Sequence, residues 1–133
     1  LQRHHVGADS RAWRTCASRR TRHRGPDGLD GPVPELQCGA LAGLVDLALD
    51  RNNLTSLPTE IGALTGLTHL ILSINAITSL PTEIGGLTAL GYMYLEFNAI
   101  TSLPTDIGAL TGLTGLYLNS NAITSLPTEL GAL

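Results

Sequence analysis

Four carboxylates recur at a fixed spacing of 23 residues and form the most regular set of side chains that could bind a metal: Glu60, Glu83, Asp106 and Glu129. If the segments that carry them stack, neighbouring carboxylates lie about 5 Å apart. That spacing is loose for shared ligation of one cation, and no other type of ligand accompanies them. We therefore interpret this column as a solvated face, and we predict no metal site and no cofactor.

Histidine and cysteine side chains do not complete a catalytic or zinc-binding set. His69 is a lone histidine without an evident neighbour that would make it a base or a ligand, and no Ser-His-Asp or Cys-His constellation is present. The side chains of His4, His5, Cys16 and His23 do not have zinc-finger spacing. The sequence therefore predicts a protein that is not an enzyme.

A repeat of 23 residues organises the chain from about residue 44 onward. The string LPTEIG begins at Leu57 and at Leu80, LPTDIG begins at Leu103, and LPTELG begins at Leu126. Ahead of each string stands the pattern LxxLxLxxNx(L/I), with Met93 at one leucine position. The period predicts that each copy is one structural unit, and that the copies stack to bury a shared core.

The spacing inside each copy assigns a structure to each part. The alternation LxL has period two and predicts a short strand with one buried face. An asparagine follows at the turn, where its side-chain amide can bond backbone groups. When the copies stack, the four asparagines are expected to form a ladder: Asn52, Asn75, Asn98 and Asn121. The prolines after each ladder residue exclude a central strand and mark the crossing to the other side. Apolar residues at every third position then predict a short helical or 3₁₀ return.

The motif LPxEIGxLxxL with this period resembles the leucine-rich repeat family, and its intracellular class related to plant Ras-group and Ras-scaffold repeat proteins. The resemblance implies an α/β fold: a curved, right-handed solenoid with a parallel β-sheet on the concave face and short helical or 3₁₀ returns on the convex side. It also implies a protein-binding role, in a signalling or scaffolding setting. We expect the array to span residues 34–133, in about four repeats.

The charge divides the chain into two parts. Residues 1–43 contain seven Arg and four acidic residues, a net charge of +3, whereas residues 44–133 contain one Arg and seven acidic residues, a net charge of −6. We expect residues 1–33 to be an irregular or disordered Arg/His-rich segment. Its cluster Arg19-Arg20-Thr21-Arg22-His23-Arg24 lacks interleaved aromatic residues for base stacking, so we do not expect a nucleic-acid partner.

The positions between and after the strand leucines predict the binding surface. All four aromatic residues of the array occupy such positions, which are expected to face solvent on the concave side. Flanking acidic residues favour a partner with basic groups. The predicted partner-binding residues are His69, Ile71, Ile74, Tyr92, Tyr94, Glu96, Phe97, Tyr117 and Asn119. A purely structural role remains an alternative, in which the tyrosines only shield the strands and pack on one another.

Two further functions stay open alongside a binding module for a protein or peptide. The last repeat lacks a polar cap, so the chain could be the recognition segment of a larger repeat-containing enzyme, such as a kinase or ubiquitin ligase. The uncapped C-terminal edge could instead drive self-association. No apolar run is long enough to span a membrane. The lack of a signal-like apolar segment and of a closely spaced cysteine cluster predicts a cytoplasmic location.

Overall fold

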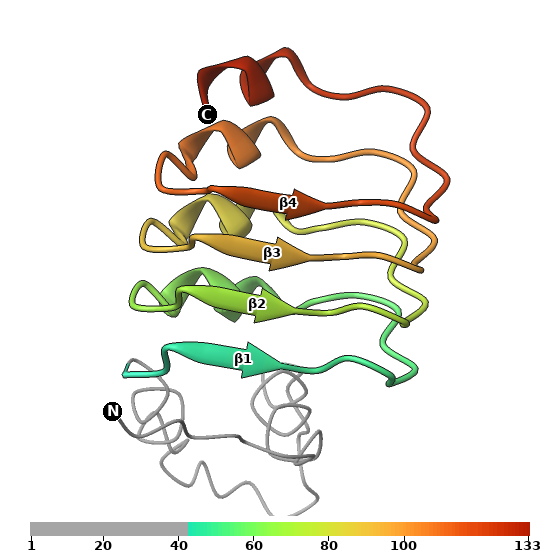
Figure 1. The fold of residues 1–133 in the computed structure, drawn as a ribbon, viewed down its shortest axis with the longest axis horizontal. Coiled ribbons are helices and arrows are strands. Elements are labelled where there is room, and N and C mark those ends of the chain that lie inside the picture. The colour runs from blue at the N-terminus through green and yellow to red at the C-terminus, as the bar shows by residue number, and fades with distance from the viewer. Residues whose placement is uncertain (1–42) are drawn as a thin grey trace, which may run out of the picture.

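The computed structural model describes residues 43–133, so the predicted segment 1–33 and its arginine cluster lie outside the described residues. Within residues 43–133, four strands alternate with four short 3₁₀ helices (Figure 1). The strands are β1 (Asp46–Ala48), β2 (His69–Ile71), β3 (Tyr92–Tyr94) and β4 (Gly115–Tyr117). The 3₁₀ helices are η1 (Thr59–Ala63), η2 (Thr82–Gly86), η3 (Thr105–Ala109) and η4 (Thr128–Ala132).

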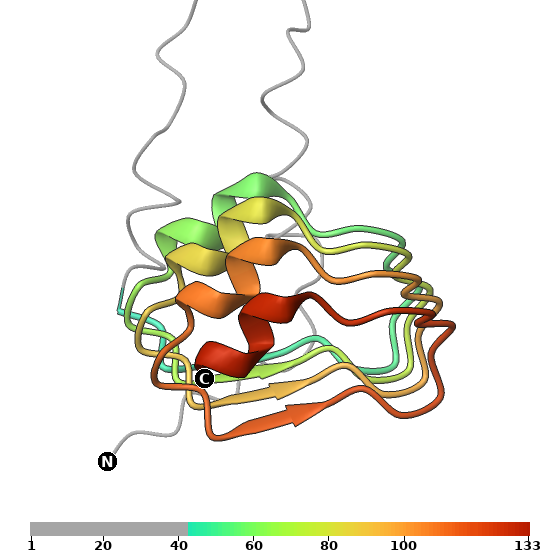
Figure 2. The same ribbon diagram turned by 90° about the horizontal axis from the view of Figure 1, so that it is seen from above.

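The strands form one parallel sheet in the order β1-β2-β3-β4, so each strand pairs with the next one along the chain. The register follows the repeat, because every paired residue lies 23 positions from its partner, as Leu47 and Leu70 do. Pairing continues past the strands, where Leu72 N donates to Tyr94 O at 2.8 Å. Seen along the stack, the sheet lines one side of each coil and the 3₁₀ helices line the opposite side (Figure 2).

Each return starts at a proline, because a proline at the N-cap has a fixed φ and no N–H to leave unbonded. Pro58 has φ −73° and ψ 153°, and the carbonyl of this residue accepts the first bond of η1 from Ile61 N at 3.1 Å. The same pattern recurs at η2, η3 and η4. The predicted 3₁₀ return and the predicted parallel sheet are both confirmed.

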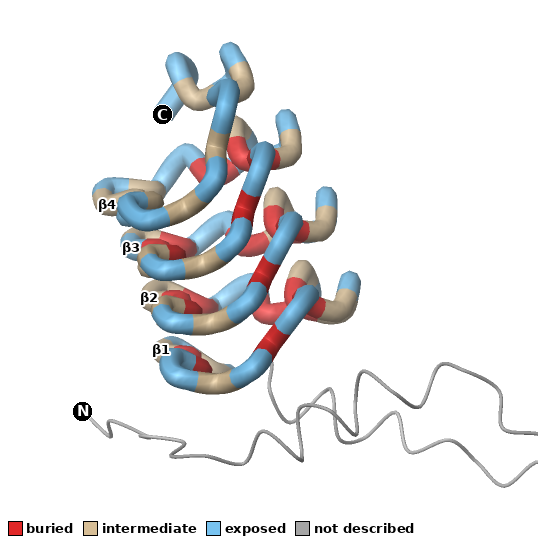
Figure 3. The backbone as a smooth tube through the Cα atoms, turned by 90° about the vertical axis from the view of Figure 1, so that its right-hand side faces the viewer, coloured by how far each residue is buried: buried red, intermediate tan, exposed pale blue. Residues whose placement is uncertain are grey.

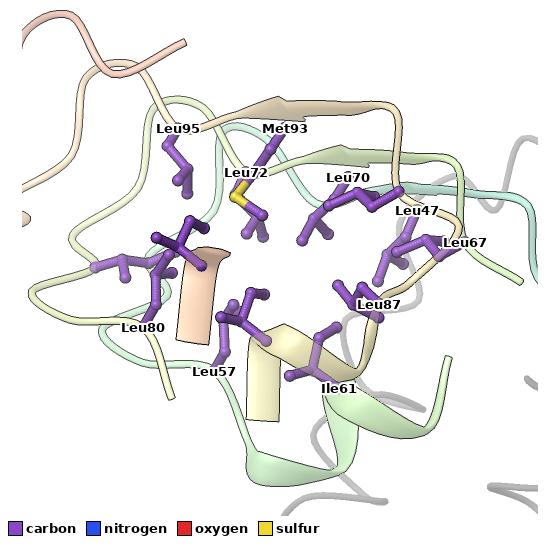
Figure 4. Packing of buried hydrophobic residues seen from close by; sticks show 14 of the residues in the cluster. Leu47, Leu57, Ile61, Leu67, Leu70, Leu72, Leu80, Leu87, Met93 and Leu95 are labelled. Carbon is purple, nitrogen blue, oxygen red and sulfur yellow. The ribbon is translucent and has the colours of Figure 1, made fainter. Parts of the chain in front are cut away.

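The core lies between these two walls and is made by the repeated apolar columns. Leucine and isoleucine side chains from the sheet and from the returns point toward one another in Figure 4. Twenty hydrophobic residues are buried there. Among residues 43–133, no polar or charged residue is buried. Three coils of the array supply all of them, whereas the coil after Leu110 contains none, as Figure 3 shows. Stacking, rather than any single copy, therefore creates the buried surface.

The asparagines after the strands join neighbouring coils by hydrogen bonds to the backbone. Asn75 Nδ2 donates to Leu72 O and to Leu49 O, both at 2.9 Å, and its Oδ1 accepts from Leu54 N at 3.0 Å. Asn98 and Asn121 repeat this arrangement one coil further on. Asn52 donates to Leu49 O and Asp50 O within its own turn. These side chains are half-buried, because they line the edge of the stack.

Candidate binding surface on the strand face

The side chains of the strands that point away from the core form two columns across the sheet. The first column contains Asp46, His69, Tyr92 and Gly115, and the second contains Ala48, Ile71, Tyr94 and Tyr117. Successive strand residues point to opposite sides, so the buried residue between the two columns anchors each strand in the core. The backbone register thereby fixes which exposed side chains become neighbours.

Four rings stack along these columns and form what we call the aromatic strip: His69, Tyr92, Tyr94 and Tyr117. The ring centroids of His69 and Tyr92 lie 5.2 Å apart with planes 8° from parallel, and those of Tyr94 and Tyr117 lie 4.7 Å apart with planes 1° from parallel. Tyr92 and Tyr94 connect the two pairs at 6.5 Å. Stacking of this kind adds about 0.5–1.5 kcal/mol per pair beyond area burial. The strip is therefore an ordered surface.

Gly115 makes room for this packing at the strand next to Tyr92. A Cβ atom placed at Gly115 would lie 2.6 Å from Tyr92 Cδ1 and 3.0 Å from Tyr117 Cε2. Those distances are shorter than carbon–carbon contacts allow. The absence of a side chain at this one position thus lets two tyrosine rings occupy the space above β4. The sequence contained this signal, since Gly115 is the glycine in a column of larger side chains.

His69 has a neighbour that the sequence analysis missed. Its Nδ1 lies 2.8 Å from Asp46 Oδ1 and 2.9 Å from Thr68 Oγ1. A carboxylate at this distance holds the imidazole with its Nδ1 proton directed at Asp46 and fixes the ring plane. The expectation that His69 lacks a partner was wrong, because a residue 23 positions earlier is adjacent in space. Among the described residues nothing bonds its Nε2, so the pair orients the first ring of the strip and completes no nucleophile–base–acid set.

Glu96 and Asn119 follow the strands on the same side as the strip, two residues beyond Tyr94 and Tyr117 respectively. Glu96 is half-buried, and its Oε2 accepts a hydrogen bond from Ser73 Oγ at 2.6 Å. Asn119 is exposed, and its backbone carbonyl accepts a hydrogen bond from Phe97 N at 3.1 Å. The polar side chains of the predicted surface therefore border the strip at the ends of the strands.

Two other predicted residues, Ile74 and Phe97, lie apart from the strip and form what we call the apolar ridge. They are 45% and 57% exposed, and among the described residues Phe97 makes no ring contact with the tyrosines. Both have positive φ angles, 58° and 55°, as do Arg51 and Ser120 at the equivalent positions. The chain turns there, which carries these side chains beyond the sheet. A left-handed conformation is costly for isoleucine and phenylalanine, so no local preference of the sequence predicts it.

An open hollow adjoins the ridge at the first two coils. It has a volume of about 550 Å³ and is lined by Arg51, Asn52, Asn53, Ile74, Asn75 and Ala76. Arg51 Nε lies 3.9 Å from Asp50 Oδ2, and both side chains are largely exposed, so this ion pair contributes little to stability. Two of its polar lining residues, Asn52 and Asn75, already donate their side-chain amides to backbone carbonyls of the ladder.

The carboxylates on the side of the 3₁₀ helices do not form a metal-binding site within residues 43–133. The side chains of Glu60, Glu83, Asp106 and Glu129 each accept a hydrogen bond from the threonine directly before them, at 3.3–3.5 Å. In the described part of the chain no three His, Cys, Asp or Glu side chains are grouped closely enough to hold a metal ion. These acids lie on the 3₁₀ helices, on the opposite side of each coil from the strip.

A family model described as a leucine-rich repeat region matches residues 36–133. The chain belongs to the leucine-rich repeat family. That family is typically a non-catalytic interaction fold, and its solenoid provides an extended surface for protein ligands. No match is found among the curated proteins with which the chain was compared.

Three solved structures are similar to the chain. A leucine-rich repeat protein of Leptospira interrogans is 33% identical with a TM-score of 0.64, and the match covers 95% of this chain and 38% of that protein. The ectodomain of the Arabidopsis thaliana receptor kinase GASSHO1/SCHENGEN3, in complex with CASPARIAN STRIP INTEGRITY FACTOR 2, is 38% identical with a TM-score of 0.63. The plant peptide hormone receptor RGFR1, in complex with RGF2, is 30% identical with a TM-score of 0.64.

These matches extend over only part of the larger proteins. The chain is covered to 72% and 73% by the two plant receptors, but it spans only 12% and 16% of their lengths. The likeness therefore concerns the repeats. No helix within residues 43–133 has the length and hydropathy needed to cross a bilayer.

Proposed function

We propose that this protein is a non-catalytic interaction module that binds a protein or peptide on its strand face, through the aromatic strip. The observation that carries the proposal is the stacked, solvent-accessible row of His69, Tyr92, Tyr94 and Tyr117. Tyr117 is 42% exposed, and the other two tyrosines keep part of their surface in contact with solvent. Tyrosines of this kind supply large contact areas at low entropic cost.

The rings are held in place before any partner arrives, which favours affinity. Each ring already packs on the next one, Asp46 fixes His69, and Gly115 accommodates Tyr92. A partner that binds a preordered surface does not have to meet the entropic cost of ordering it. A purely structural role of the tyrosines requires the same stacking, so the test separates binding from stability.

The setting of this module is part of the proposal. Two of the similar structures are receptors in complex with the factor or hormone named with them. By analogy we propose a peptide or protein ligand for this chain, in signalling or scaffolding, with catalysis left to other proteins or domains. The cytoplasmic location expected from the sequence stays a prediction.

The proposal can be tested with a phage-displayed library of random 12-residue peptides. The library is selected for binding to the full chain, so no ligand sequence has to be assumed. The comparison target is the triple variant Tyr92→Ala, Tyr94→Ala, Tyr117→Ala. We expect the peptides enriched on the native chain to lose most of their binding to this variant, because its flat anchors are gone. Thermal unfolding, followed by circular dichroism, should show a midpoint close to that of the native chain.

The control is the set Thr82→Ala, Thr105→Ala, Thr128→Ala, which alters the exposed start of three returns and leaves the strand face unchanged. These variants should keep the binding of the enriched peptides. Peptides that bind the triple tyrosine variant as tightly as the native chain would show that the strip is not the binding surface. A variant that unfolds would support the purely structural role of the tyrosines.

A further inference from the structure

Glu96 lies between the aromatic strip and the apolar ridge. It follows Tyr94 by two residues along the extended chain and directly precedes Phe97, which is 57% exposed. Its backbone carbonyl accepts from Ile74 N at 2.9 Å and from Asn98 Nδ2 at 3.3 Å. The backbone of Glu96 is therefore fixed by the preceding coil and by its own ladder residue.

The carboxylate of Glu96 is also fixed, by Ser73 on the preceding coil. The Ser73 Oγ–Glu96 Oε2 distance of 2.6 Å is that of a short hydrogen bond to an ionised acceptor. One carboxylate oxygen is thus occupied, and the side chain is half-buried. A carboxylate held in this way can accept further hydrogen bonds with little loss of side-chain freedom.

Glu96 differs from the other two acids of the strand side, Asp46 and Asp50, in the kind of side chain that lies next to its carboxylate. Asp46 is paired with His69, and Asp50 lies 3.9 Å from Arg51. Within residues 43–133 no basic side chain approaches Glu96, and Arg51 is the only arginine of this part. Of these three carboxylates, Glu96 is the one whose side-chain partner within residues 43–133 is a neutral hydroxyl rather than a histidine or an arginine. A partner with a cation at that point gains from it, and a partner with an anion is repelled.

We propose that Glu96 is the specificity-determining residue of this surface and that it binds the guanidinium or ammonium group of an arginine or lysine in an extended peptide. The inference rests on the proposed function, whose binding surface it uses. The aliphatic stem of such a side chain packs on Tyr94 and Phe97 on either side of Glu96, and its charged end meets the carboxylate. The net charge of −6 over residues 44–133 favours a basic peptide and opposes nucleic acids and anionic lipid surfaces.

The same 12-residue library provides the test, panned on full-length native chain, on Glu96→Gln and on the charge reversal Glu96→Arg. Glutamine keeps the acceptor for Ser73 and removes only the charge. The matched control is Glu83→Gln, which makes the same change on exposed helix η2 of the return side. Synthetic peptides from the enriched clones, labelled with fluorescein, then give dissociation constants by fluorescence anisotropy.

We expect native-chain clones to share an arginine or lysine and to bind Glu96→Gln about tenfold more weakly or worse, since a hydrogen bond to a charged group is lost. Binding to Glu83→Gln should not change, and Glu96→Arg should select aspartate or glutamate at the shared position. The inference would be overturned by clones that need the tyrosines but share no cation, or that bind Glu96→Gln at native strength. Clones that do not need the tyrosines would instead overturn the proposed function, and the inference with it.

Discussion

At the scale of single residues, the ladder asparagines connect one coil to the next through groups that a parallel sheet leaves unbonded. Asn98 illustrates the arrangement, because its Nδ2 donates to Leu72 O and Leu95 O, both at 3.0 Å, and its Oδ1 accepts from Ile77 N at 3.1 Å. The two carbonyls have a second donor each, from Asn75 and Asn121. The amide of Ile77 has only Asn98 among the described residues.

The variant Asn98→Ala should therefore leave the N–H of Ile77 without an acceptor, beside a fully buried side chain. We expect a loss of about 1–3 kcal/mol in the free energy of unfolding, measured by urea titration. The control Asn53→Ala changes an exposed asparagine at a position where the later coils have alanine, and it should be neutral. Equal effects of the two substitutions would show that the ladder bonds do not stabilise the fold.

Pairs of polar residues were harder to predict than the apolar columns. Asp46 with His69, and Ser73 with Glu96, are each 23 residues apart, so reading the columns across neighbouring copies would have found both pairs. The positive φ of Ile74 could not be found in this way. Isoleucine disfavours that conformation, and stacking of the coils imposes it against the local preference.

At the scale of the elements, the 3₁₀ returns approach one another so closely that glycine is required where they touch. A Cβ atom at Gly62 would lie 2.5 Å from Glu83 O, and one at Gly85 would lie 2.9 Å from Asp106 O. The periodic apolar residues of the sequence predict a short return. The close approach of neighbouring returns explains why the glycine recurs, a reason that the sequence pattern alone does not provide.

The substitution Gly62→Ala should force η1 and η2 apart and destabilise the protein by about 1–3 kcal/mol, the usual cost of overpacking. Gly131→Ala is the matched control, since it lies at the equivalent position of η4 and a Cβ atom there meets nothing within 4 Å. Thermal denaturation of the two variants compares them directly. A midpoint for Gly62→Ala at or above that of Gly131→Ala would contradict the close packing of the returns.

At the scale of the whole molecule, stability is shared unevenly, because within the described residues no further coil covers the outer side of the last one. Equivalent leucines show this in the third and fourth copies. Leu103 is 7% exposed, whereas Leu126, 23 residues later, is 58% exposed. The sequence predicts both as core residues of one motif, and only their place in the stack separates them.

Leu103→Ala should cost about 2–5 kcal/mol, as core truncations of this kind do. Leu126→Ala should cost well under about 1 kcal/mol, since a largely exposed side chain loses little on truncation. Urea unfolding of both variants, at one protein concentration, gives the comparison. A cost for Leu126→Ala close to that of Leu103→Ala would mean that another surface, such as a second copy of the chain, covers this end in solution.

The central claim, that the strand face is the binding surface, is tested most directly by nuclear magnetic resonance. Two-dimensional ¹H–¹⁵N spectra of the full chain would be recorded with increasing amounts of an enriched 12-residue peptide. We predict that the shifted amide signals belong to residues 69–71, 92–97 and 115–119, while those of η1 to η4 stay in place. Shifts confined to the returns or to the residues after Asn119 would contradict it.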